Sequence, residues 1–205
     1  MARPVGADAD KTRHNVLAAA ARLFAERGFE GTPMRLIAEE CGVTPATVHF
    51  YFGGKDDLRQ AVVERMYAEL ATVREDLQQA LDAAGRSTGR DGARKVVSEA
   101  TVRLFRFARA HADAVRLLLR TAIERGELDE RRRAEIHLPY LDRSSAALAA
   151  LTGGDPRALR LALQSSLHLV VRYALTSDRE LALVGDVPEP QASAAIERHL
   201  TDAIS

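Results

Sequence analysis

The sequence is poor in cysteine and in aromatic residues. Its 205 residues include one cysteine, no tryptophan, and an aromatic fraction of 5%. Cys41 has no partner for an intrachain disulfide, so we expect a reducing compartment, the cytoplasm. No run approaches the roughly eighteen apolar residues that a membrane-spanning helix needs, and the first residues lack the apolar segment of a secretory signal. The sequence therefore predicts a cytoplasmic protein without a membrane partner.

An excess of charge of one sign is also absent. The chain has 29 lysines and arginines against 29 aspartates and glutamates, which gives a net charge of zero. Residues 1–60 are balanced as well, with eight basic against eight acidic residues. Nucleic-acid-binding proteins often carry a basic excess. Any DNA binding by this chain must therefore depend on where the charges lie and on two copies acting together.

Motifs for catalysis are missing too. The sequence contains no nucleophile elbow, phosphate-binding loop or dinucleotide-binding glycine pattern. Adjacent acidic residues such as Glu39 and Glu40 diverge on a helix, so they do not form a carboxylate pair. The histidines at 111, 137 and 168 lack the spacing of zinc ligands. We therefore expect no enzyme activity, no cofactor and no metal.

The residues that are abundant favour helices. The chain is rich in alanine, leucine, arginine and glutamate and has few β-branched runs, so we expect an all-α protein. Residues 1–10 are expected to form a flexible arm, and residues 83–92 a loop. Helices are expected over about 11–27, 33–41, 45–52, 55–82, 93–111, 112–125, 130–151, 156–176 and 191–205.

Residues 32–58, TPMRLIAEECGVTPATVHFYFGGKDDL, are the most specific stretch. They predict two short helices joined by a tight turn at Gly42, the arrangement of a helix-turn-helix. Thr32 and Thr44 are each followed by proline, which predicts two N-caps with proline at the first helical position. In the second short helix, Val48 and Phe52 are four residues apart and are expected to face the core.

This part of the chain resembles the DNA-binding domain of the TetR family of bacterial transcriptional repressors. The resemblance covers residues 12–58, through TRHNVLAAAARLFAERGFEGT and MRLIAEECGVTPATVHFYFGGKDDL. It implies a three-helix DNA-binding helix-turn-helix domain at 1–54 and a helical ligand-binding and dimerisation domain at 55–205. The DNA contacts that the resemblance implies are Arg35, Thr44, Pro45, Ala46, Thr47, His49, Tyr51 and Lys55.

Some of these residues have a second interpretation. Thr44 serves equally well as a helix cap alone, and Tyr51 as a core aromatic. His49 stands where many relatives have tyrosine. Small residues at the start of the helix allow close approach to base edges, and hydroxyl groups and Lys55 can contact phosphates.

The C-terminal part is expected to pair two copies and to hold a ligand. Two helices carry apolar stripes that predict a four-helix dimer interface, formed by Leu159, Leu163, Leu167, Val170, Ala192, Ala195, Ile196 and Leu200. The alternative is that both stripes serve the core of one chain. Polar or aromatic residues within apolar helices are the expected pocket residues: Phe105, Arg116, His137, Tyr140, Gln164 and His168.

The sequence thus predicts a ligand-released repressor that binds a palindromic DNA operator as a homodimer and responds to an unknown small-molecule effector. The long apolar stripe that begins at Leu58 predicts that one helix reaches from the DNA-binding part into the ligand-binding part. The alternatives are an activator on the same fold and an all-helical enzyme.

Overall fold

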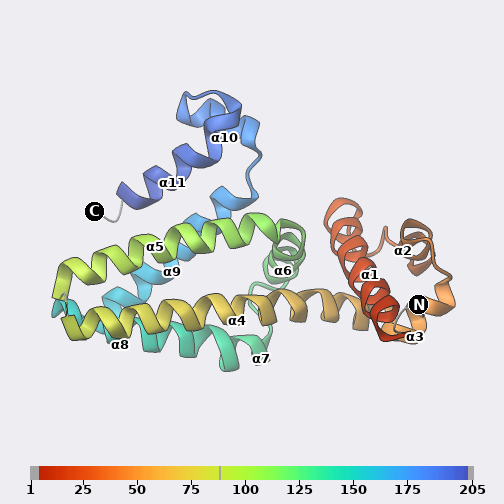
Figure 1. The fold of residues 1–205 in the computed structure, drawn as a ribbon, viewed down its shortest axis with the longest axis horizontal. Coiled ribbons are helices and arrows are strands. Elements are labelled where there is room, and N and C mark those ends of the chain that lie inside the picture. Colours follow the sequence, from red (N-terminus) through yellow and green to blue (C-terminus); the bar gives the residue numbers. More distant parts are fainter. Residues whose placement is uncertain (1–4, 88, 203–205) are drawn as a thin grey trace. The chain divides into compact units, whose positions relative to one another are not determined.

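The computed structural model describes residues 5–87 and 89–202, which form helices and no strands (Figure 1). The predicted all-α class is therefore confirmed. The α-helices are α1 (Val5–Arg27), α2 (Met34–Cys41), α3 (Pro45–Phe52), α4 (Lys55–Ser87), α5 (Gly89–Ala110), α6 (Ala112–Arg125), α7 (Glu130–Arg132), α8 (Leu138–Thr152), α9 (Pro156–Leu175), α10 (Asp178–Gly185) and α11 (Ala192–Asp202). A π-helical turn, η1 (Arg133–His137), and a 3₁₀ turn, η2 (Glu189–Gln191), complete the described elements.

The helices group into two compact units. The first extends to Glu69 and includes Asp113–Gly126, and the second comprises Leu70–Ala112 and the chain from Glu127 onward. α4 supplies residues to both. The predicted functional boundary between residues 54 and 55 stays a prediction.

The first unit has a core built by α1, α2, α3 and the start of α4. The apolar stripe predicted on α1 is confirmed, because each of its members is at most 3% exposed: Val16, Leu17, Ala20, Leu23 and Phe24. α2 contributes Ile37 and Ala38, and α3 contributes Val48 and Phe52. With both of its buried residues on one side, α3 has a fixed inner face.

Two glycines shape the turns of this unit. Gly28 ends α1 with φ at +76°, and the guanidinium of Arg120 lies so close that a Cβ atom there would approach Nη1 to 2.8 Å. Gly42 ends α2 in the left-handed conformation, with φ at +65° and ψ at 30°. Residues with a Cβ atom are strained in that conformation, so the turn between α2 and α3 depends on glycine, as predicted.

Thr32 is not the helix cap that the sequence suggested. The N-cap of α2 is Pro33, which has no side-chain hydrogen bond. Thr32 is instead fully buried, and its hydroxyl lies 2.8 Å from the carbonyl oxygen of Gly28 and 3.1 Å from that of Leu23. Its hydroxyl thus donates to carbonyls at the end of α1 and does not cap α2.

The second unit packs α9 against both α5 and α8, while α11 lies against α5 and α10 (Figure 1). One core cluster joins α5, α9, α10 and α11 through Phe105, Ala108, Val170, Ala174, Leu181, Ala182, Ala192, Ile196 and Leu200. Another joins Leu81, Ala93 and Leu148. Among the described residues no helix is long and apolar enough to cross a membrane.

α4 carries the predicted apolar stripe through both units. Leu58, Val62 and Met66 are buried in the first unit, and Leu77 and Leu81 in the second. Leu70 and Val73 are half-buried. The same side of one continuous helix therefore serves two cores.

Several predicted boundaries were wrong. α1 begins at Val5, so residues 5–10 of the expected arm are helical, with Asp8 in the first turn where an acidic side chain is favourable. Residues 83–87 and 89–92 are helical and not a loop. This segment has three glycines but no proline, and a glycine within a helix costs only about 1 kcal/mol. The π-helical turn and α10 were not predicted.

Candidate nucleic-acid interface

The start of α3 is fixed by a confirmed cap. Thr44 has extended backbone angles, φ −82° and ψ 152°, and its hydroxyl oxygen accepts a hydrogen bond from the backbone N–H of Thr47 at 3.2 Å. The two threonine hydroxyls are also hydrogen-bonded, at 2.9 Å. Pro45 occupies the first helical position. These contacts, together with buried Val48 and Phe52, hold α3 in one orientation on its unit.

The opposite side of α3 faces solvent. Thr44, Pro45, Ala46, His49 and Phe50 are exposed, and Thr47 and Tyr51 are half-buried. The predicted DNA-contact residues of α3 therefore share one arc, and Tyr51 is not a fully buried core aromatic. We refer to Thr44–Thr47 with His49–Tyr51 as the exposed arc.

Phe50 is the residue that the sequence analysis left out of the contact set. Its side chain is 83% exposed, the highest value among the large apolar residues described. Its ring makes an edge contact with Tyr51, with 5.4 Å between centroids and an interplanar angle of 76°. The sequence did contain the signal. Position 50 lies two residues, and so about 200° around the helix, from the buried positions 48 and 52.

His49 has a fixed ring. Its Nδ1 lies 2.8 Å from the carbonyl oxygen of Gly53. Because a carbonyl only accepts, Nδ1 carries the hydrogen and donates it. Nε2 is thus the ring nitrogen left for an outside partner.

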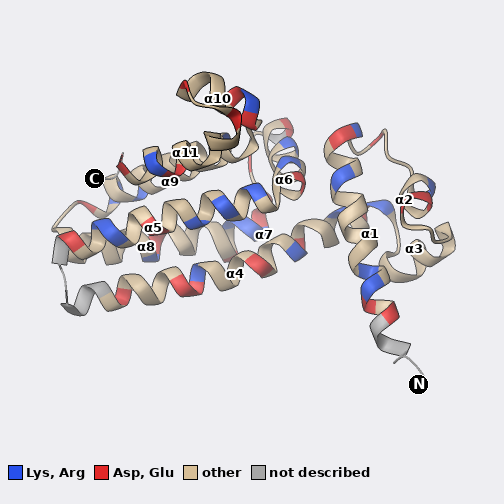
Figure 2. Cartoon of the chain, turned by 45° about the horizontal axis from the view of Figure 1, so that its top comes forward, with Lys and Arg blue, Asp and Glu red and all other residues tan. Residues whose placement is uncertain are grey.

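Cationic side chains come from the helices that flank α3. Figure 2 shows α3 without a charged residue, and basic residues on α1, α2 and the start of α4. The Lys55 Nζ lies 4.3 Å from the centroid of the Phe29 ring, which positions the ammonium through a cation–π contact. Arg13 lies over Phe52, with its Cζ 5.4 Å from the centroid.

Arg35 is held less firmly. It pairs with Glu39 at 2.8 Å, but its side chain is 74% exposed. An exposed pair of this kind contributes at most about 1 kcal/mol. The guanidinium is therefore free to exchange Glu39 for a phosphate or a base.

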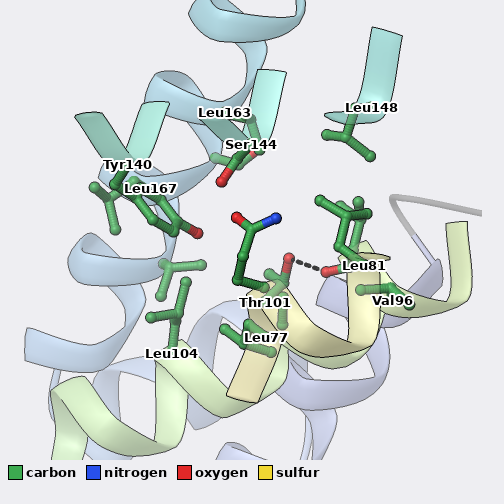
Figure 3. Close-up of a pocket in the computed structure, with 15 residues that line it drawn as sticks. Leu77, Leu81, Val96, Thr101, Leu104, Tyr140, Ser144, Leu148, Leu163 and Leu167 are labelled. Atoms are coloured by element: carbon green, nitrogen blue, oxygen red, sulfur yellow. Dashed lines mark hydrogen bonds between the residues drawn. The ribbon is translucent and has the colours of Figure 1, made fainter. Parts of the chain in front are cut away.

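The second unit contains a cavity between α4, α5, α8 and α9, with a volume of about 60 Å³. None of the described residues that line it is charged. They are Leu77, Gln78, Leu81, Val96, Val97, Ala100, Thr101, Leu104, Tyr140, Ser144, Leu148, Leu163, Ser166, Leu167 and Val170. Figure 3 shows the hydroxyls of Tyr140 and Ser144 turned toward this space, with leucines around them.

Of the six predicted pocket residues, Tyr140 alone lines this cavity. Phe105 is fully buried in the core cluster with α9, α10 and α11. Arg116 is exposed in the first unit and pairs with Asp113. The sequence could not place these two residues, because an aromatic or polar residue within an apolar helix does not indicate which side of the helix it occupies.

The remaining three predicted pocket residues form a separate polar cluster. The Gln164 side-chain nitrogen lies 2.7 Å from Nε2 of His168, and His137 is hydrogen-bonded to Gln164. Burial lowers the pKa of His137, the hydrogen bond with Gln164 opposes that effect, and the positive charges of His168 and Arg160 lower the pKa further. Arg160 is itself paired with Asp142. No group of three metal-binding side chains occurs within the residues that the structure describes.

The predicted dimer residues point into their own chain. Val170, Ala192, Ile196 and Leu200 are buried in the intrachain core, and Leu163 and Leu167 line the cavity. Leu159 packs on the Leu81 cluster, and Ala195 is half-buried. These contacts favour the alternative interpretation, in which the stripes serve the core of one chain. The exposed side of α9 instead carries Ala158, Leu161, Ala162, Ser165 and Leu169.

Comparison with known proteins identifies the first unit. The family model described as "Bacterial regulatory proteins, tetR family" matches residues 16–62, which include all of α2 and α3. The chain carries a TetR-type DNA-binding domain in this stretch. Its fold agrees with that of a TetR-like transcriptional regulator from Rhodococcus sp. RHA1, at 21% identity and a TM-score of 0.61, over 98% of this chain and 96% of that one.

Two curated relatives resemble part of the chain. HTH-type transcriptional regulator UidR of Escherichia coli (strain K12) is 33% identical over 72 residues, which are 35% of this chain and 37% of that protein. HTH-type transcriptional repressor NicS of Pseudomonas putida is 37% identical over 60 residues, 29% of this chain and 28% of that one. The matched stretches thus cover 37% and 28% of these relatives.

Proposed function

We propose that this protein is a ligand-released transcriptional repressor that binds a palindromic DNA operator as a homodimer in the cytoplasm. The observation that carries the proposal is the exposed arc of α3. The arc is uncharged and includes the solvent-exposed Phe50, and the neighbouring helices carry cations. A surface of this kind fits base edges in the major groove, with phosphates on either side.

The geometry supports the contact set that the resemblance implies. Ala46 and Phe50 lie one turn apart and offer apolar surface to thymine methyl groups. Thr47, Tyr51 and Lys55 offer hydrogen-bond donors to phosphates, and His49 offers Nε2. Arg35 reaches a base or the backbone after leaving Glu39. Thr44 and Pro45 place the start of the helix against the groove.

A homodimer places two copies of α3 in successive major grooves, about 34–36 Å apart. We propose that the exposed side of α9 forms the interface, with Leu161 and Leu169 at its centre. Their side chains are 70% and 42% exposed in the single chain. The face is self-complementary in size, because Ala158, Ala162 and Ser165 leave room between these leucines.

Repression is proposed over activation because this chain resembles part of NicS, a transcriptional repressor. The effector is proposed to bind in the cavity of the second unit. Ligand binding in the cavity must then affect the position of α3. We propose that α4 couples the cavity to α3, because it supplies Leu77, Gln78 and Leu81 to the cavity and begins at Lys55, next to the exposed arc. A coupling of about 1–3 kcal/mol changes operator occupancy from several-fold to about a hundredfold.

The test is selection of bound fragments from genomic DNA by the purified full-length protein. We expect enrichment of a palindrome with half-sites one helical turn apart. Ala46→Glu, which places an acid on the exposed arc without touching the core, should abolish enrichment. Arg179→Ala, on the exposed side of α10, is the matched control and should leave it unchanged. Enrichment that survives Ala46→Glu would contradict the proposed interface.

A further inference from the structure

The walls of the cavity in the second unit restrict what it can hold. Its described lining residues carry no charge. Moving an ion from water into such surroundings costs several kcal/mol unless a partner charge compensates it. The cavity walls supply no such partner, which disfavours both carboxylates and ammonium groups.

Most polar groups in the walls are already used within the chain. The Thr101 hydroxyl donates to the carbonyl of Val97 at 2.8 Å, and the Ser166 hydroxyl donates to that of Ala162 at 2.9 Å. The Gln78 amide nitrogen donates to Asp82 at 2.9 Å. The amide oxygen of Gln78 and the Tyr140–Ser144 pair are what remain for a ligand.

Tyr140 and Ser144 lie one turn apart on α8 and form a hydroxyl pair. Burial raises the pKa of Tyr140, and the hydrogen bond with Ser144 and the charge of Arg74 oppose this effect. The phenol thus stays protonated at neutral pH and can donate a hydrogen bond. Arg74 is the cation whose charge acts on the pKa of Tyr140, but it does not line the cavity.

We propose that the effector is an uncharged, largely apolar molecule with one oxygen acceptor, such as an ester or ketone, which accepts a hydrogen bond from the Tyr140–Ser144 pair. This assignment rests on the proposed function, since it names the ligand class of the same site. The cavity of about 60 Å³ is less than half of the roughly 150 Å³ that accepts benzene. An aliphatic effector therefore enters by displacing leucine side chains, including those of α4.

The experiment compares matched probes that share an eight-carbon chain: methyl octanoate, octan-2-one, octanoate and octylammonium. Binding to the full-length protein is measured by calorimetry without DNA. We expect the two neutral probes to bind at least tenfold more tightly than either ion. Equal or tighter binding of octanoate would overturn the proposal and assign the site to Arg74. Failure of both neutral probes to bind would overturn it as well.

Three variants localise the binding. Tyr140→Phe and Ser144→Ala each remove one hydroxyl and should weaken methyl octanoate about threefold to tenfold, while leaving octane binding unchanged. Ala100→Leu fills the cavity from α5 and should abolish binding of all probes. Thermal unfolding without probe shows whether each variant is folded. Unchanged methyl octanoate affinity in both hydroxyl variants would remove the hydroxyl pair from the site.

Operator release is measured separately, by adding methyl octanoate to the protein–DNA complex. Binding of the probe without release would contradict the ligand-released part of the proposed function and leave the ligand class standing. Release by an ion that does not enter the cavity would contradict the ligand class alone.

Discussion

The contact proposed for Phe50 can be tested by removing one methyl group from DNA. Deoxyuridine differs from thymidine only in lacking the C5 methyl, so replacing single thymines tests the apolar contact without changing base pairing. Burying one methyl group is worth about 0.8 kcal/mol. A symmetric replacement in both half-sites of an operator therefore costs about 1.6 kcal/mol, or roughly fifteenfold in Kd.

The variant for this test is Phe50→Ala. Because Phe50 is 83% exposed, its truncation leaves the core intact and should change the free energy of unfolding by no more than about 0.5 kcal/mol. Affinity is measured by fluorescence anisotropy for wild type and variant, each on the thymine and deoxyuridine operators. We expect the wild type to lose about fifteenfold at one thymine position, and the variant to lose nothing there, which is the signature of a direct contact in a double-mutant cycle.

Two results would refute the reasoning. If the wild type binds thymine and deoxyuridine operators equally at every position, Phe50 reads no methyl group. If Phe50→Ala keeps the full dependence on the methyl group, the contact belongs to another apolar residue of the arc, and Ala46 is the next to test. Loss of all DNA binding by the wild type at low salt would instead contradict the proposed function itself.

Lys55→Ala should weaken binding to all sequences and lower the slope of log K against log salt by about 0.9 for each copy, with Arg179→Ala as the unchanged control. Arg35→Ala should also relax sequence preference, which selection from random DNA would reveal. Thr44→Ala should lower the free energy of unfolding by about 1 kcal/mol in urea denaturation, and Thr44→Ser should restore it; if serine restores stability but not DNA affinity, the threonine methyl contacts DNA. Burial lowers the pKa of His137 below its ordinary value of 6.5, so the unfolded chain binds more protons below that pH and the free energy of unfolding should fall from pH 7 to pH 5. In His137→Gln this part of the decline should disappear, and an unchanged pH profile would contradict it.

The helix-turn-helix was predictable because its determinants are local. The cap at Thr44 and its partner Thr47 are three residues apart, and the buried pair Val48 and Phe52 are one turn apart. Both partners of each interaction therefore lie within one short stretch of sequence. Thr32 shows the limit of this reasoning, because its hydroxyl has partners four and nine residues earlier, on α1. Its position before a proline suggested a cap that tertiary contacts replace.

α10 was not predicted, although the sequence contains a pattern that marks its start. Ser177 is followed three residues later by Glu180, the pattern of a capping box, and its hydroxyl accepts a hydrogen bond from the backbone N–H of Glu180 at 3.2 Å. The helix is short, and Leu181 and Ala182 are its buried residues. Two buried residues give no measurable periodicity, so only the capping box at Ser177 could have predicted this helix.

The proposed dimer face and the cavity could not be predicted from local sequence patterns. An apolar stripe shows that one side of a helix is covered, but it does not show whether the same chain or a second copy covers it. The sequence allows Val170 and Ile196 to lie either in a dimer interface or in the core of one chain. In the structure both belong to the same intrachain core cluster. Leu161 and Leu169 lie off that stripe, so their exposure supports the proposed dimer face only once the fold is known.

The size of the cavity also limits how an effector can act. A ligand shifts an equilibrium only by its difference in affinity for the two states. An occupant that fits the existing 60 Å³ without moving any side chain stabilises the present arrangement of α4 and gives no release. An occupant that requires Leu77 and Leu81 to move binds better wherever α4 has already shifted. In the proposed function, the small cavity therefore links release to the volume of the effector, while the uncharged walls link affinity to its charge.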